Sequence, residues 1–116
     1  MDHIALTHGF FRIHQEDSPE TGSENATAIV PAEIPAPLRS RVQETAKAVY
    51  RALGARGLSR VDMFLTEAGT VILNEVNTFP GLTSYSRYPR MMAAAGWPLG
   101  AVIDRWVDLA LAGQRR

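Results

Sequence analysis

The feature that most constrains the fold is a pair of β-favouring runs separated by a short reversal. Residues 58–66 (LSRVDMFLT) and 70–77 (TVILNEVN) are rich in Val, Ile, Leu and Phe, and Gly69 lies between them. A glycine at a tight reversal between two such runs is typical of a β-hairpin. We therefore predict an antiparallel hairpin over these residues.

Helical periodicity surrounds this hairpin. Apolar residues recur at steps of three or four between Leu38 and Leu53, and Gly54 supplies a stop. The pattern predicts an α+β fold in which helices cover an antiparallel sheet. The other predicted elements are short strands within 4–14 and over 26–30, a short helix over 89–96 and a helix from Pro98 to Gly113.

Composition excludes several classes of protein. The chain has 116 residues, enough for one small domain, and its 12 Lys+Arg balance 12 Asp+Glu, which argues against a general nucleic-acid binder. It has no Cys, so disulfide scaffolds and thiolate metal sites are excluded. No apolar run approaches a membrane span, and no secretory signal is visible at the N-terminus, so a cytoplasmic location is expected.

The hairpin carries polar residues where a purely structural strand would avoid them. If the loop is symmetric, Asp62 lies opposite Glu75 and Arg60 lies opposite Asn77. Side chains alternate between the faces of a strand, so all four project from one face. The other face is expected to carry the mostly apolar set of Val61, Met63, Leu65, Ile72, Asn74 and Val76.

Two carboxylates directly opposite each other repel and need solvation, a shared proton or a cation between them. Carboxylate and amide oxygens suit a hard cation such as Mg²⁺ or Mn²⁺, and the Arg60 fork suits a phosphate oxygen. Two interpretations stay open: a metal site, or a solvated face with a local Arg–Asp pair. A three-residue loop would slip the register by one and scatter the acids onto opposite faces.

Three motifs resemble a known family. Residues 60–62 (RVD), 74–78 (NEVNT) and 80–84 (PGLTS) resemble the C-terminal signature of D-alanine–D-alanine ligases, which are ATP-grasp enzymes. Residues 11–16 with 22–26, and 83–92 (TSYSRYPRMM), are similar to the vancomycin-resistance branch, which makes D-alanyl-D-lactate. The resemblance implies that residues 1–116 are a C-terminal fragment of an ATP-grasp domain.

This resemblance implies roles for the polar face. Asp62, Glu75 and Asn77 would hold two Mg²⁺ (or Mn²⁺) ions that bridge the phosphates of ATP. Asn74 would join Glu75 in binding the nucleotide cofactor. Arg60 would contact the transferred phosphate and the tetrahedral intermediate.

The resemblance also implies a substrate subsite. The backbone N–H of Gly81 would complete an oxyanion site, and Ser86 with Arg87 would bind the carboxylate of the second substrate. His14 would lie over that subsite, with the acidic segment 15–27 forming a lid-type loop.

The implied reaction has two steps. ATP phosphorylates the carboxylate of one D-alanine, and the acyl phosphate is attacked by D-lactate or by a second D-alanine. Family members are much longer, and the single lysine, Lys47, lies on the solvated face of its helix, so the chain alone is expected to be inactive. Two alternatives stay open: another ATP-grasp carboxylate ligase, or a non-catalytic remnant whose exposed apolar patch forms a homodimer.

A cationic His14 would favour D-lactate over D-alanine, because D-lactate is an anion whereas D-alanine at neutral pH is a zwitterion. In a complete ligase that contains this segment, His14→Tyr is expected to change how the ratio of the two rates depends on pH. Rates with both nucleophiles, measured across neutral pH, check this. An unchanged ratio would count against a charge on His14 as the discriminator.

Overall fold

The computed structural model describes residues 1, 3–6 and 26–114, which fall into two compact units, residues 1–33 and 34–116. In the first unit, β1 (His3–Leu6) pairs with β2 (Ala26–Ile29) in antiparallel register, with His3 opposite Ile29. Short strands were predicted in both regions, and the described residues confirm them. The last two residues assigned to the 15–27 loop, Ala26 and Thr27, belong to β2 instead.

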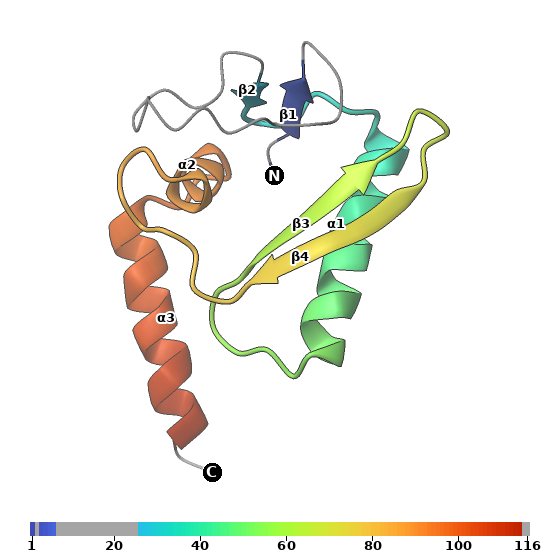
Figure 1. Cartoon of the computed structure of the whole chain (residues 1–116). Coiled ribbons are helices and arrows are strands. Elements are labelled where there is room, and N and C mark those ends of the chain that lie inside the picture. The colour runs from blue at the N-terminus through green and yellow to red at the C-terminus, as the bar shows by residue number, and fades with distance from the viewer. Residues whose placement is uncertain (2, 7–25, 115–116) are drawn as a thin grey trace, which may run out of the picture. The chain divides into compact units, whose positions relative to one another are not determined.

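The second unit begins with α1 (Ala36–Ala52), as the periodicity predicted. Prolines are tolerated in a first helical turn because its N–H groups have no partner within the helix, and α1 has one there. The helix ends before Gly54, whose φ of +60° is costly for any other residue. It lies along one face of the hairpin (Figure 1), and the Arg41 guanidinium donates to the carbonyl of Gly69 at the hairpin loop, 3.1 Å away.

The hairpin consists of β3 (Arg60–Leu65) and β4 (Val71–Asn77). Its loop is closed by two backbone hydrogen bonds, from Thr66 N–H to Thr70 O at 3.0 Å and from Gly69 N–H to Thr66 O at 2.9 Å. Gly69 has φ +79°, the left-handed conformation that closes a three-residue loop. The loop is therefore the asymmetric kind that was expected to scatter the acids.

A β-bulge cancels that slip. Near the loop Met63 lies opposite Leu73, but beyond an irregularity at Asp62/Met63 the pairs become Asp62–Glu75, Val61–Val76 and Arg60–Asn77. The predicted pairing of the acids is confirmed. The predicted apolar face was wrong on the loop side of the bulge, where Ile72 lies opposite Phe64 and Leu73 takes the place opposite Met63. Asn74 is the extra residue of the bulge and has no partner in the register, because β4 must absorb one residue to bring Glu75 opposite Asp62.

Two further helices complete the unit, α2 (Arg87–Ala94) and α3 (Leu99–Gln114). Both were predicted, and α2 starts two residues earlier than expected because Pro89 fits within its first turn. The short connection between them passes through Gly96, with φ +86°. No helix in the ranges that the structure describes is both long and apolar enough to cross a membrane.

Few described residues of the second unit are buried. They include Leu58 just before β3, Pro80 after β4 and Val102 in α3. Trp106 of α3 packs so closely on Gly57 that a methyl group on this glycine would lie 2.6 Å from the indole nitrogen. The Tyr50 hydroxyl donates to the carbonyl of Gly57 at 2.8 Å and fixes the α1–β3 loop to α1.

Several large apolar side chains of the described residues are exposed, as the sequence analysis predicted. On α3 the exposed side chains include Ile103, Val107 and Leu111, which form a stripe at steps of four residues. Other large apolar side chains are also exposed: Leu53, Phe64, Leu65, Ile72, Leu73, Phe79, Tyr85, Trp97 and Leu109. The homodimer expected of such a surface stays a prediction, which sedimentation velocity on the purified chain checks.

The Trp106 contact makes Gly57 the most sensitive glycine of the α1–β3 connection. Gly54→Ala and Gly57→Ala both place a side chain at positive φ, but only Gly57 has a neighbour within 4 Å. We expect Gly54→Ala to lower the free energy of unfolding by about 1 kcal/mol and Gly57→Ala by about 2–4 kcal/mol. Urea unfolding followed by tryptophan fluorescence measures both, and equal losses would contradict the packing argument.

Candidate metal and substrate site

An arginine–aspartate pair lies within β3. The Arg60 Nε donates to Asp62 Oδ1 at 2.8 Å, and an Arg60 terminal nitrogen donates to Asp62 Oδ2 at 2.9 Å. The two residues share a face because they are two positions apart on a strand. Their side chains are only 21% and 26% exposed, so water screens this pair less than it screens a surface ion pair.

Glu75 faces this pair from β4. It lies directly opposite Asp62, and its Oε1 is 4.0 Å from Arg60 Nη2, the same nitrogen that donates to Asp62 Oδ2. The Glu75 side chain is 61% exposed. A single guanidinium thus reaches both carboxylates and offsets the repulsion that their opposition would otherwise cause.

Two asparagines flank Glu75 on β4. Asn77 is opposite Arg60, and its Oδ1 accepts the backbone N–H of Phe79 at 3.0 Å. This bond turns the chain away from the strand toward Pro80 and Gly81. Asn74 is exposed at the bulge, where it is the residue inserted between the apolar pairs and the acids.

These donors fit a hard divalent cation. Asp62 and Glu75 supply carboxylate oxygens at one register position, and Asn77 supplies an amide oxygen two residues further on the same face. The positive charge of Arg60 already stands beside both carboxylates, which shows that the position suits a cation. No cluster of three or more His, Cys, Asp or Glu occurs among the described residues, so a bound ion would take further oxygens from water or phosphate.

A second cluster forms after β4. Ser86 immediately precedes α2, its backbone N–H donates to Thr83 O at 3.0 Å, and the two hydroxyl oxygens share a hydrogen bond of 2.6 Å. Gly81 packs against this pair so tightly that a methyl group there would lie 2.7 Å from Ser86 Oγ. Two predicted site residues, Gly81 and Ser86, are therefore in contact.

The sequence analysis did not predict that Thr83 would hold Ser86 through hydrogen bonds. The signal was its spacing of three residues before a helix-starting serine, a pattern that lets the two side chains meet across one turn. Arg87, the other residue of the predicted carboxylate subsite, is the first residue of α2 and is half-buried. His14 and residues 15–25 lie outside the described residues, so their predicted places remain predictions.

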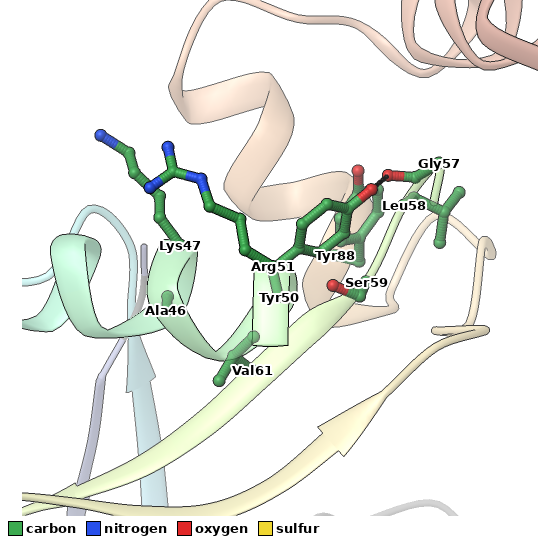
Figure 2. A pocket seen from close by; sticks show the side chains of 9 residues that line it. All are labelled: Ala46, Lys47, Tyr50, Arg51, Gly57, Leu58, Ser59, Val61 and Tyr88. Carbon is green, nitrogen blue, oxygen red and sulfur yellow. Dashed lines mark hydrogen bonds between the residues drawn. The ribbon is translucent and has the colours of Figure 1, made fainter. Parts of the chain in front are cut away.

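A groove of about 440 Å³ lies on the other face of β3 (Figure 2). It contains Val61, whose side chain alternates with those of Arg60 and Asp62, so the groove and the carboxylates occupy opposite faces. Burial raises the pKa of Tyr88 there, and nearby Tyr50 adds to this, so the phenol stays protonated at neutral pH. The full lining is Ala46, Lys47, Tyr50, Arg51, Gly57, Leu58, Ser59, Val61 and Tyr88.

Lys47 stands at the rim of this groove and pairs with Glu44 at 2.8 Å, both side chains being more than half exposed. The hydrogen bond from Lys47 and its charge lower the pKa of Glu44. The expectation that this lysine occupies the solvated face of α1 is confirmed.

The chain is similar to a known protein family over most of its length. Residues 1–108 match the family described as the D-ala D-ala ligase C-terminus. The chain belongs to this family. Its α+β architecture is that of the C-terminal part of these ATP-grasp ligases.

Individual relatives support the assignment. Over all 116 residues the chain is 74% identical to a candidate D-alanine–D-lactate ligase of Streptomyces coelicolor, and over 111 residues, 96% of the chain, it is 67% identical to the vancomycin B-type resistance protein VanB of Enterococcus faecalis. The crystal structure of D-alanine–D-alanine ligase from Bacillus anthracis complexed with ATP superposes with a TM-score of 0.77, at 29% identity, over 98% of the chain. The chain spans about a third of each of these proteins, 34%, 32% and 36%.

The contact between Gly81 and Ser86 leads to a prediction. Gly81→Ala should push Ser86 Oγ away from Thr83 and lower the free energy of unfolding by about 1–3 kcal/mol. Gly100→Ala is the matched control, because Gly100 lies in α3 with nothing within 4 Å and alanine favours a helix by about 1 kcal/mol. Chemical denaturation of both variants checks the difference, and a Gly81→Ala chain as stable as the wild type would contradict the contact.

Proposed function

We propose that this chain is the metal- and substrate-binding part of an ATP-dependent ligase that joins D-alanine to D-lactate, or to a second D-alanine, in the synthesis of peptidoglycan precursors and in vancomycin resistance. The observation that carries the proposal is the opposition of Asp62 and Glu75 on one face, with Arg60 beside both. The names of the relatives support the substrate class.

On this proposal Asp62, Glu75 and Asn77 hold two Mg²⁺ or Mn²⁺ ions, and Asn74 with Glu75 contributes to binding ATP. The ions, when bound, neutralise charge on the phosphate oxygens. Arg60 offers a planar donor fork of the kind that binds a phosphoryl group in two places. Its half-buried position reduces screening by water, which strengthens its interaction with the charge that develops during transfer.

The loop after β4 would serve the second substrate. The Gly81 backbone N–H donates to the oxyanion, and its lack of a side chain leaves room for Ser86 Oγ beside it. Ser86 and Arg87 bind the carboxylate of D-lactate or D-alanine, and Thr83 positions Ser86 through their hydroxyl hydrogen bond. His14 and residues 15–27 keep the predicted role of a lid over this subsite.

Phosphoryl transfer gives the acyl phosphate of the first D-alanine and ADP. The hydroxyl of D-lactate, or the amine of D-alanine, then attacks the acyl carbon, and inorganic phosphate leaves. Arg60 stabilises the departing phosphate and Gly81 the tetrahedral oxyanion, so the two clusters act on opposite ends of the bond that breaks. Of the alternatives, the 74% identity to a candidate D-alanine–D-lactate ligase favours this acceptor over that of another carboxylate ligase.

The test uses a chimaera in which these 116 residues replace the matching third of the Streptomyces coelicolor relative. The chimaera should release ADP from ATP in the presence of D-alanine and D-lactate, whereas the 116-residue chain alone should not. Asp62→Asn should lower kcat by about 100-fold or more, because it removes charge where metal and phosphate meet. Asp108→Asn, on the exposed side of α3, is the matched control and should leave kcat unchanged.

Two outcomes would contradict the proposal. A chimaera that folds but makes no ester or dipeptide would exclude the assigned reaction for this segment. Full activity in the Asp62→Asn chimaera would exclude the metal role of this face.

A further inference from the structure

The Arg60 guanidinium stands where a divalent cation would. It uses two nitrogens to bind both oxygens of Asp62, at 2.8 and 2.9 Å, and reaches to 4.0 Å from Glu75. A metal ion shared by these carboxylates needs the same oxygens. Guanidinium and metal therefore compete for one position.

We propose that Arg60 acts as a resident counter-cation, which keeps Asp62 and Glu75 opposed in the metal-free chain and must be displaced before a divalent ion binds. The inference rests on the metal site proposed above. Arginine remains protonated at every pH that a folded protein survives, so its charge cannot be removed by titration. The exchange therefore requires movement of the side chain.

The strand geometry explains why a resident cation is needed. The register forces the two acids directly opposite each other, a placement that destabilises an antiparallel pair when it is uncompensated. Glu75 is 61% exposed and largely hydrated, but Asp62 is only 26% exposed, so water compensates the aspartate poorly. The two-point contact with Arg60 supplies that compensation.

Displacement has a consequence for the phosphate. Once a metal ion takes the Asp62 oxygens, the Arg60 fork is released on the same face of the hairpin, close to the ion. A fork of this shape matches two oxygens of a phosphate. Metal binding would thus free the donor that the phosphoryl group needs, and the two ligands would bind in a coupled manner.

The first experiment tests the counter-cation without metal. In EDTA, the Arg60→Gln variant of the 116-residue chain should melt about 5 °C below the wild type, because the acids are left to repel. The double variant Arg60→Gln/Glu75→Gln should recover most of this loss. Arg56→Gln removes the same charge from an exposed loop position and is the matched control. A melting temperature of Arg60→Gln equal to that of Arg56→Gln would overturn the proposal.

The second experiment measures competition, by titrating Mn²⁺ into each chain and following the electron paramagnetic resonance signal of the free ion. Arg60→Gln should bind Mn²⁺ about tenfold more tightly than the wild type, a gain that a purely structural arginine would not give. Arg60→Lys keeps the charge but not the two-point contact, so its affinity for Mn²⁺ should lie between those of the wild type and Arg60→Gln. The same variant tests the proposal if Arg60→Gln does not fold. Asp62→Asn should abolish the binding.

The outcomes separate this proposal from the metal site on which it rests. Binding that depends on Asp62 but is equal in wild type, Arg60→Gln and Arg60→Lys would overturn the competition and leave the metal site standing. Binding that is absent from every chain, or unaffected by Asp62→Asn, would overturn both.

Discussion

The opposition of two carboxylates across one antiparallel pair is the constraint on which the candidate site depends. Asp62 and Glu75 occupy the same register position, between the apolar pairs Val61–Val76 and Met63–Leu73. The arrangement persists because Arg60, two residues before Asp62, reaches both acids with a single planar charge. Repulsion between the two carboxylates lowers the stability of the hairpin, and a purely structural strand would gain nothing from it. The pairing is therefore better explained if the acids bind a ligand.

The register that creates this opposition is the sum of two local irregularities. A three-residue loop displaces the strands by one position, and the bulge at Asn74 displaces them back. Each alone would separate the acids onto different faces. Together they leave apolar pairs near the loop and charged pairs near the open end, so one short hairpin presents a packing region and a site region in succession.

The sequence was sufficient for the helices, because prolines, glycine stops and apolar periodicity are local signals. The apolar run from Leu38 to Leu53 agrees with the bounds of α1, Ala36–Ala52, within two residues at each end. The opposed acids were also predicted, but through a symmetric loop that the chain does not have. Periodicity of two cannot reveal a loop slip and a bulge that cancel each other. The Thr83–Ser86 hydrogen bond and the groove beside Val61 depend on contacts between elements, which residue patterns do not specify.

Trp106 links parts of the molecule that are far apart in sequence. Its ring lies 5.9 Å from that of Phe79, two residues before Gly81, and it also packs on Gly57 just ahead of β3. One indole on α3 therefore contacts both the segment before β3 and the segment after β4. The position of Gly81, whose amide is proposed to bind the oxyanion, therefore depends in part on a contact with the C-terminal helix.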